Sequence, residues 1–371
     1  MLPGGLNRYR QELPSLLMRL QEWAWHGDAM PSRQVSGTKQ PMIRRNLLLG
    51  AAAALSVPML ALAQSRRPLR IVVPFAPGGA IDLIGRLLAD RLPPFLDGQT
   101  VVVDNRGGAG GLIGAENLAR SVPDGTTLGI LGVSAVCVFP SLYDRLPYDP
   151  THDFAPVTQI TSGVSLCTVN AETAQRNGWN DLSAMIRWAR ANPSGLSGAS
   201  SGTGTTSHLL ISALGKLGGA EIVHVPYRGG APALQDLLTG TVDMMFDVPT
   251  ILLPHVADGK LRAMAVSSGE EFSLIPGVPG MKNFRDVGLG ELDMVAWNAI
   301  MAPAGTPPEI VQRQHEAIAK VAREPGFGER FQQMGFLPVT NESPAALAEL
   351  IRRDTPAWRR LAEISGIKLS L

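Results

Sequence analysis

The sequence predicts an α/β fold of two doubly wound domains that are joined by a hinge and enclose a ligand cleft. Three observations lead to this prediction. Short apolar, β-branched segments alternate with amphipathic helical segments, which is typical of βα units. The alternation forms two series, and the C-terminal segment then adds a strand and two helices that return to the first domain. A chain of 371 residues is long enough for two domains that each bury a core of their own.

The first series opens with an apolar strand that ends in Pro77, Gly78 and Gly79, a combination that breaks a strand. From Ile81 onward the apolar residues recur at helical spacing, so a helix starts directly after the turn. The predicted strands of this series are 69–75, 100–104, 127–133, 154–160 and 164–169, and the helices are 81–92 and 111–120.

The second series starts near Asn180, a suitable N-cap for a helix that stops before Pro193. The return consists of a strand at 294–301, a helix that opens at Pro307-Pro308 and runs to 321, and a helix at 344–365. We therefore expect the first domain to comprise 66–168 and 294–371, and the second 169–293. The second series has predicted helices at 180–190, 206–217, 231–238 and 251–257, and strands at 196–200, 221–227, 242–247 and 261–267.

The N-terminal part carries the pattern of an export signal at 42–63. Met42 and Arg44-Arg45 precede an apolar stretch, and cleavage is expected near Ala63-Gln64. A general secretory signal and a twin-arginine signal both fit. We expect 1–41 to be an extension from a start codon placed too early. The mature chain would then be periplasmic, without stable insertion in a membrane.

The composition disfavours nucleic acid and metal ions as partners and leaves the pairing of the two cysteines open. A formal net charge of +1 and 5% aromatic residues do not favour nucleic acid. No two histidines of the mature chain have metal-ligand spacing, so no metal is expected. Cys137 and Cys167 could form a disulfide in an oxidising compartment, or both could be core residues.

Two strand–turn–helix segments, one in each half, are candidate binding elements. In the first, Gly78 and Gly79 allow close approach, and the free amides of the next helix suit an anion. In the second, 198–208, hydroxyls and glycine amides could hold a carboxylate without a buried counter-charge. An ordinary βα connection and a flexible surface loop are the respective alternatives. Asp247, at the end of a strand, could accept from a ligand or cap the next helix.

An enzyme is the competing hypothesis. Gly198-x-Ser200-x-Gly202 matches a nucleophile elbow, and Ser200, Asp247 and His255 follow the hydrolase order. The motif lies in a Ser/Thr/Gly-rich loop, and no HGGG-type oxyanion segment precedes it. The glycines at 107–114 offer no G-x-G-x-x-G register, which disfavours a dehydrogenase.

Many motifs occur in the order of one known family. The chain resembles a Bug-type (TctC-like) receptor, the extracytoplasmic solute-binding component of tripartite tricarboxylate transporters. This resemblance covers essentially the whole mature chain. The motifs include Pro77-Gly78-Gly79-x-x-Asp82, Val103-Asp104-Asn105-Arg106, Pro123-Asp124-Gly125, Leu146-Pro147-Tyr148-Asp149, Ser207-His208-Leu209, Val225-Pro226-Tyr227 and Ala302-Pro303-Ala304-Gly305.

The resemblance implies a monomeric periplasmic binding protein (type II) that closes on a small carboxylated solute. Dicarboxylates, tricarboxylates, acidic amino acids and aromatic acids are all compatible. The partners would be the large and small membrane subunits of a transporter (TctA- and TctB-like), or a sensor protein in a signalling system. The resemblance implies neither catalysis nor a cofactor.

Carried over residue by residue, the resemblance assigns ligand contacts to loop amides, hydroxyls and bridging waters on two walls. Departures from the family pattern at Ile81, Cys137 and 279–284 put the local polarity of the pocket and the inter-domain loop in doubt. The expected first wall is Phe75, Pro77, Gly78, Gly79, Ala80, Asp82, Ser134 and Ala135, and the second is Ser201, Thr203, Gly204, Thr205, Thr206, His208, Tyr227 and Asp247.

Overall fold

The computed structural model describes residues 67–193 and 195–370, which belong to one compact unit, Ser65–Leu371. The predictions for the extension 1–41 and the signal 42–63 lie outside the described residues. No helix within the described residues is long and apolar enough to cross a membrane.

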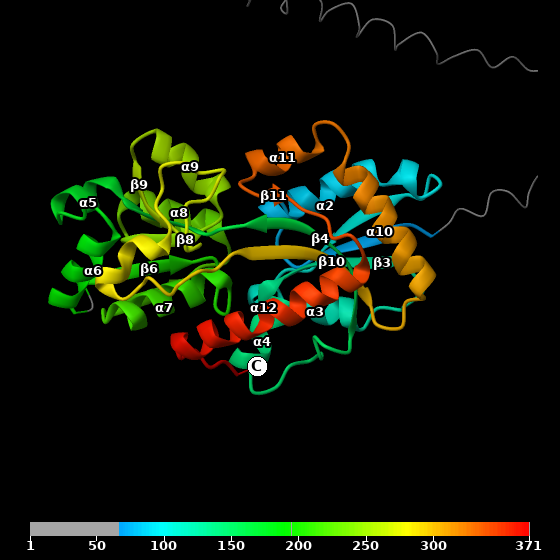
Figure 1. The fold of residues 1–371 in the computed structure, drawn as a ribbon, viewed down its shortest axis with the longest axis horizontal. Helices are drawn as coiled ribbons and strands as arrows, with labels where there is room; N and C mark the ends of the chain where they lie inside the picture. The colour runs from blue at the N-terminus through cyan, green and yellow to red at the C-terminus, as the bar shows by residue number, and fades with distance from the viewer. Residues whose placement is uncertain (1–66, 194, 371) are drawn as a thin grey trace, which may run out of the picture. The chain divides into compact units, whose positions relative to one another are not determined.

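The first sheet has six strands and is mixed (Figure 1). β1 pairs in parallel with β2 and β3, whereas β10 runs antiparallel to both of its neighbours, β3 and β4. We call this sheet and its helices the first lobe. In spatial order its strands are β11 (Leu337–Pro338), β4 (Phe154–Gly163), β10 (Ala296–Pro303), β3 (Thr127–Gly132), β1 (Leu69–Val73) and β2 (Val101–Asn105).

Helices cover both faces of this sheet. Apolar residues of α2, α10 and α11 form one core cluster with β1, β3 and β4. The other face is covered by α3 and by part of α12. The bounds of these helices are α2 (Ala80–Arg91), α3 (Leu112–Ala119), α10 (Pro308–Ala322), α11 (Phe327–Gln333) and α12 (Pro344–Ser365).

The second lobe repeats this plan with a five-stranded sheet. β6 is parallel to β7 and β8, and β5 is antiparallel to β8 and β9. The spatial order is β7 (Ile222–Pro226), β6 (Leu196–Ser200), β8 (Met244–Asp247), β5 (Leu166–Asn170) and β9 (Leu261–Val266). The helices are α5 (Ala171–Arg176), α6 (Leu182–Ala191), α7 (Thr206–Gly218), α8 (Gly230–Thr239) and α9 (Pro249–Ala257).

The α/β class and the helices on both sheet faces are confirmed, and both sheets are mixed. In the first sheet β1, β2, β3 and β4 run in one direction against β10 and β11, and in the second β6, β7, β8 and β9 run in one direction against β5. β5 and β10 are the strands that enter a sheet after the chain has crossed from the other lobe. Each arrives against the direction of its new neighbours, and hydrophobic pattern alone does not report that direction.

Several short elements were missed. After β3 the chain forms a π-helical turn, η3 (Ser134–Val138), and then α4 (Phe139–Leu142). This stretch is apolar and almost wholly buried, so it gives no amphipathic signal. The 3₁₀ turns η1 (Pro93–Phe95), η2 (Ala109–Gly111) and η4 (Met281–Val287) were missed as well.

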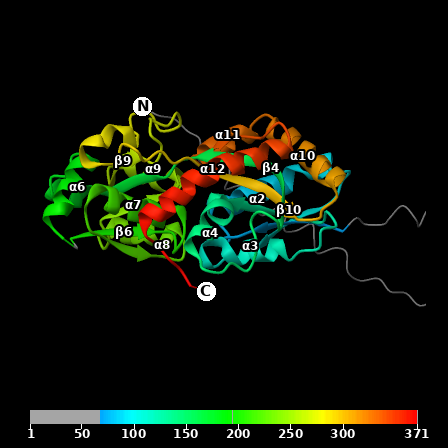
Figure 2. The same cartoon turned by 60° about the horizontal axis from the view of Figure 1, so that its bottom comes forward.

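One helix connects the two lobes. α12 packs against α7 of the second lobe and against β4, η3 and α4 of the first, as Figure 2 allows the reader to follow. Its buried residues belong to a core cluster that includes residues from both sheets. Cys137 and Cys167 lie in the same cluster, and both are buried and free.

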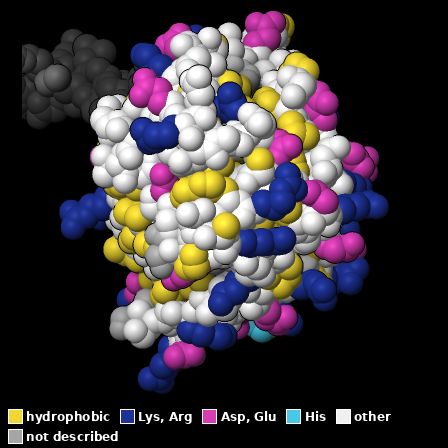
Figure 3. Space-filling model, turned by 90° about the vertical axis from the view of Figure 1, so that its left-hand side faces the viewer, with side chains coloured by type: hydrophobic (Ala, Val, Ile, Leu, Met, Phe, Trp, Pro, Cys, Tyr) yellow, Lys and Arg dark blue, Asp and Glu magenta, His cyan; other side chains and the backbone are white. Residues whose placement is uncertain are grey.

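On the face that Figure 3 shows, the surface has no large patch of side chains with the same charge. There, basic and acidic side chains alternate with apolar ones. This agrees with the small net charge of the whole chain.

Candidate functional site

The candidate residues gather at the carboxyl ends of the parallel strands in each lobe. In the first lobe these ends carry the loops 74–79, 106–111 and 133–134, and in the second the loops 201–205 and 227–229 and residue Val248. Ligands of open α/β sheets bind at such edges. A Cβ placed on Gly110 would lie 2.8 Å from the Thr203 carbonyl oxygen, and Val248 packs on the first lobe's core. The two edges therefore face each other.

The first turn, between β1 and α2, is open to solvent from Phe75 to Gly79. Gly78 has φ +86°, which a side chain would strain, and no atom lies within 4 Å of where its Cβ would be. Gly79 is the N-cap of α2 and offers no side chain to the first amides. A ligand at this turn therefore meets backbone amides at the positive end of a helix.

Asp82 lies beneath this turn. Its side chain is 1% exposed, and Oδ2 accepts from the Gly78 amide at 2.8 Å and from Arg86 Nε at 2.9 Å. Oδ1 accepts from Asn105 Nδ2 at 2.9 Å. Burial acts to raise the pKa of Asp82, but the hydrogen bonds from Arg86, Gly78 and Asn105 outweigh it, so the pKa is lowered. The contacts of Asp82 hold the turn in shape.

The glycine loop after β2 is a part of the site that sequence reasoning had not included. A Cβ on Gly107 would lie 3.1 Å from the Ala76 amide nitrogen, and Gly110 abuts Thr203 as described above. The signal was available, because the loop is rich in glycine and follows a strand that was expected. It was considered only as a dinucleotide fingerprint.

Ser134 and Ala135 begin the π-helical turn at the end of β3, beside β1 in the sheet. Ser134 is partly exposed. Ala135 is buried, and its carbonyl oxygen accepts from the Tyr148 hydroxyl at 2.8 Å. The sheet thus brings these residues to the same edge as the first turn.

In the second turn most hydroxyls bond one another. The Thr205 hydroxyl donates to the Gly202 carbonyl oxygen at 2.6 Å, and the Ser201 amide donates to Ser207 Oγ at 3.1 Å. Ser201 Oγ and Thr205 Oγ1 both lie within 3.1 Å of Ser207 Oγ. Within 67–193 and 195–370, the Thr203 and Thr206 hydroxyls have no hydrogen bond. Only part of the expected hydroxyl set is therefore available to a ligand.

Below this turn lies a stacked pair of histidines, of which only His208 was among the expected site residues. The rings of His208 and His224 have centroids 3.6 Å apart and an interplanar angle of 10°. The Gly204 amide donates to His208 Nδ1 at 3.1 Å, so the neutral ring carries its proton on Nε2. Burial, and for His208 the neighbouring His224, lowers the pKa of both rings to about 4. At neutral pH both rings are uncharged, and His208 anchors the loop.

The arrangement expected of a serine hydrolase is not formed at Ser200. Ser200 is 0% exposed, and its hydroxyl lies 2.6 Å from Nε2 of His224, not of His255. Nδ1 of His255 and Oδ2 of Asp247 are buried without a partner in the described part of the chain. A buried hydroxyl cannot reach a substrate carbonyl in this conformation.

Tyr227 and Asp247 lie at the carboxyl ends of strands in the second sheet, but their polar atoms have different partners. The Tyr227 hydroxyl donates to Asp236 Oδ2 at 2.6 Å, and burial followed by that bond raises the pKa of Tyr227 to about 12. Asp247 Oδ1 accepts from the Val248 amide, while Oδ2 lies 2.6 Å from where a Cβ of Gly230 would be. Burial raises the pKa of Asp247 to about 6.

Within the described ranges, no three His, Cys, Asp or Glu side chains come close enough to hold a metal ion. The features that remain are two opposed helix N-termini with exposed amides and a few free hydroxyls. Such an arrangement can bind an anion.

Comparison with known proteins adds the family. The model of the tripartite tricarboxylate transporter family receptor (TctC) matches residues 84–367. This chain belongs to that receptor family. The resemblance seen in the sequence motifs is thereby confirmed, and the family is one of solute-binding receptors.

Among the curated relatives of this receptor is Protein BugT of Bordetella pertussis, 34% identical over 320 residues, which are 86% of this chain and 95% of the relative. A protein of Pseudomonas sp. encoded between tcbD and tcbE is 35% identical over 322 residues, covering 86% and 93%.

Solved structures, among them that of the periplasmic binding protein BugD, share the receptor's fold. BugD is 32% identical, with a TM-score of 0.73 over 82% of this chain and 99% of that one. MatC of Rhodopseudomonas palustris, solved with bound malate, is 30% identical, with a TM-score of 0.72 over 80% and 99%. Rpa4515 of R. palustris, solved with adipate, is 29% identical, with a TM-score of 0.74 over 83% and 100%.

Proposed function

We propose that this receptor captures a small carboxylated solute between the carboxyl edges of its two lobes. The observation that carries the proposal is the opposition of two helix N-termini, those of α2 and α7, behind glycine turns. No side chain caps α2, and on α7 Thr205 caps only the His208 amide. Each helix therefore keeps amides free for a carboxylate oxygen. MatC and Rpa4515, which were solved with malate and adipate, support the same ligand class.

Capture proceeds by closure of one lobe on the other. The chain crosses between the sheets after β4 and again between β9 and β10, and these crossings serve as the hinge between the two lobes. The expected domains, 66–168 with 294–371 and 169–293, are shifted at the first crossing, because β5 (Leu166–Asn170) lies in the second sheet. A solute that touches the first turn on one lobe and the 201–205 loop on the other has more contacts in the closed state. That difference in contacts is what shifts the equilibrium toward closure.

The candidate contacts leave the solute open among dicarboxylates, tricarboxylates, acidic amino acids and aromatic acids. On the first lobe they are the exposed turn from Phe75 to Ala80 and the Ser134 hydroxyl. On the second they are the amides and hydroxyls of Thr203 and Thr206, and Asp247 as an acceptor for a solute donor; the Gly204 and Thr205 amides are already bonded within the loop. Asp82, Thr205 and His208 act by holding the two turns in place.

The receptor functions in the periplasm as a monomer after cleavage near Ala63-Gln64, and delivers the solute to the membrane subunits of a tripartite transporter. A sensor that binds the same solute is the alternative. Deleting the gene separates the two roles: loss of solute uptake indicates delivery, and loss of a transcriptional response with normal uptake indicates sensing.

The class of solute is tested by isolating the mature chain, 64–371, from the periplasm without refolding. Denaturation should release a carboxylate in stoichiometric amount, identified by mass spectrometry. Calorimetric titration of the stripped protein should show that the acid rebinds. Failure to bind any of a broad panel of acids would contradict the proposal.

The role of the helix amides is tested by Ala80→Pro. Ala80 is the first residue of α2, where proline keeps the helix but has no N–H to donate. Gly79 is already extended (φ −77°, ψ 166°), as the residue before a proline must be. Loss of one hydrogen bond to a charged group should weaken the affinity for the solute about 10- to 100-fold. The control Ala80→Ser keeps the amide and should bind normally; equal affinities of the two variants would contradict the assignment.

A further inference from the structure

The chain ends beside the candidate ligand loop. α12 stops at Ser365, and Gly366, with φ +68°, reverses the chain into a tail of residues 366–370. The Leu369 amide donates to the Leu142 carbonyl oxygen at 2.8 Å, and Leu369 forms a parallel bridge with Tyr143. Lys368 Nζ donates to the Ser141 carbonyl oxygen at 3.1 Å. The tail is thus attached to α4 of the first lobe, and Figure 1 shows the C-terminus beside that helix.

The side chain of Leu369 occupies the space next to Gly204. A Cβ on Gly204 would lie 3.2 Å from Leu369 Cδ1, 3.6 Å from Phe139 Cε1 and 3.7 Å from the Tyr143 hydroxyl oxygen. Phe139 and Tyr143 pack edge to face, with ring centroids 5.5 Å apart. These three side chains form an apolar surface on which the backbone of the 201–205 loop rests. We call this surface the Leu369 support.

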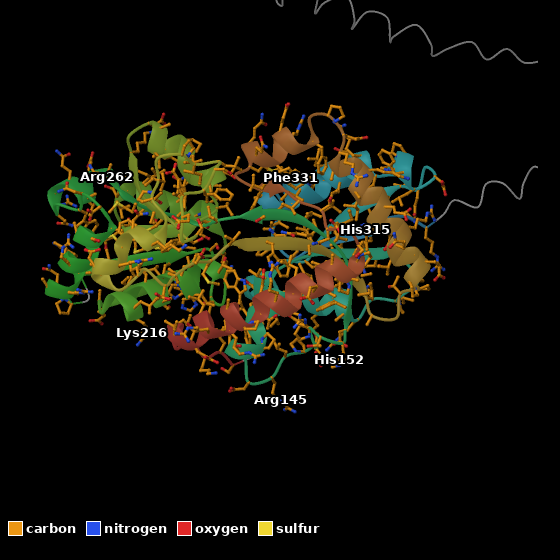
Figure 4. The ribbon with its side chains drawn as sticks, in the orientation of Figure 1. Arg145, His152, Lys216, Arg262, His315 and Phe331 are labelled. Carbon is orange, nitrogen blue, oxygen red and sulfur yellow. The ribbon has the colours of Figure 1, made fainter. Side chains whose placement is uncertain are left out.

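The same support reaches the glycine loop of the first lobe. A Cβ on Gly110 would lie 3.9 Å from Phe139 Cζ and 3.6 Å from Thr205 Cγ2. Three segments distant in sequence, the glycine loop after β2, the 201–205 loop and the tail, therefore lie near Phe139. Where the tail begins, α12 ends beside α7: a Cβ on Gly366 would lie 4.0 Å from Cε of Lys216, which is labelled in Figure 4.

We propose that Leu369 is a positioning residue that holds the 201–205 loop in its binding conformation and couples the loop to the first lobe. The proposal rests on the assignment of that loop to ligand binding. His208 holds Gly204 from below through the amide, and Leu369 holds it from the side through packing. The loop belongs to the second lobe and the support to the first, so their contact depends on how the lobes are arranged. Without Leu369 the loop must be ordered when the solute binds, which weakens affinity.

Hydrogen exchange of the ligand-free receptor tests this directly. In Leu369→Ala, and in a chain that ends at Gly366, the amides of 201–208 should exchange about tenfold faster, with the rest of the chain nearly unchanged. Leu369→Met fills most of the same space and should restore slow exchange. The matched control Lys368→Ala removes a tail contact that does not face the loop and should leave 201–208 as in the wild type.

Two outcomes would overturn the proposal: unchanged exchange at 201–208 in Leu369→Ala, or faster exchange throughout the chain in proportion, which would indicate a purely structural role. Titration with malate and adipate gives the second readout, and the dissociation constant should rise about tenfold in Leu369→Ala at an unchanged number of sites. The exchange measurement needs no ligand. Absence of binding by the wild type would therefore count against the proposed function and leave the exchange result to decide the role of Leu369.

Discussion

The two candidate turns occupy the same position in their sheets, yet they are stabilised in different ways. β1 and β6 each lie between two parallel neighbours and each lead through a glycine turn into a helix. The first turn is poor in side chains and is held from beneath by the buried carboxylate of Asp82. The second is rich in hydroxyls, but most of them bond one another, and two neutral histidines support it.

This difference shows that composition alone misjudges what a turn offers to a ligand. The second turn seemed suited to bind through hydroxyl groups, whereas its Ser201, Thr205 and Ser207 hydroxyls stabilise the turn itself. In both turns the main groups that remain free to bind a ligand are the amides at the start of a helix. We therefore expect that substitution of the residues that support either turn, Asp82 or the two histidines, weakens solute binding because the backbone amides of the turn change position.

The largest effect is expected from Asp82→Ala, which removes the support of the first turn. Donors on Gly78, Arg86 and Asn105 lose their acceptor, and we expect the free energy of unfolding to fall by about 3 kcal/mol, with loss of solute binding. Urea unfolding and titration measure the two effects. Arg86→Gln is the control: its side chain is 52% exposed, so water replaces it and the loss should be about 1 kcal/mol. Equal losses in the two variants would show that Asp82 acts only through Arg86.

A smaller, pH-dependent effect is expected at the second turn. The pKa of His208 and His224 is about 4 in the folded chain and about 6.5 in an unfolded one, so the unfolded state binds more protons between these values. The free energy of unfolding should therefore fall as the pH is lowered from about 6.5 to about 4. His208→Asn retains an acceptor for the Gly204 amide but does not titrate. Between pH 6.5 and pH 4 its free energy of unfolding should therefore fall by about 1–2 kcal/mol less than that of the wild type.

The control for this measurement is His152→Asn. His152 is exposed and pairs with Asp149, far from the second turn in sequence and contacts. Its removal should leave the loss of stability between pH 6.5 and pH 4 in place. If His208→Asn shows the full wild-type loss, the stacked pair does not govern the acid response of the receptor.

The smallest effect, with the opposite sign, is expected from Asp247→Asn. Burial raises the pKa of Asp247 to about 6, so the folded state takes up this proton before the unfolded state does as the pH falls. The charge therefore costs stability above pH 6, and the variant should be more stable than the wild type by about 1 kcal/mol at pH 7.5, a gain that vanishes below about pH 4. Asp243→Asn, whose carboxylate accepts from Ser197, should bring no such gain. A stability equal to wild type at pH 7.5 would show that Asp247 is well solvated.

Much of this architecture could be predicted from local patterns. The β6 strand was located with the bounds that the structure has, and α2 and α7 within a residue of theirs, because glycine turns and apolar periodicity are local signals. The antiparallel entry of β5 and β10 could not be predicted, since strand direction is decided by how the chain returns from the other lobe. The π-helical turn at Ser134 was hidden in a uniformly apolar stretch.

The residues chosen from the sequence gather at two facing strand edges, and the contacts that sequence reasoning missed are those that support them. His208 was selected as a cleft residue, but it is buried beneath the loop and bonds the Gly204 amide. His224 was not among the expected site residues, because nothing near it in sequence indicates that it stacks on His208. Leu369 lies at the far end of the chain from Gly204, and only the folded molecule brings them together. Such supports depend on contacts between distant residues, which a single sequence does not contain.

The late arrival of β10 has a consequence for synthesis of the chain. β4 pairs with β10 and β11 only, and β3 needs β10 as its second neighbour, yet both strands leave the ribosome long before residue 296. Until residues 296–303 are available, on the ribosome or after export, the first lobe has two open strand edges, at β3 and β4. Open edges of this kind pair readily with other chains. The first lobe of this receptor should therefore complete its folding only after the whole second lobe has been made, unlike a domain that is continuous in sequence.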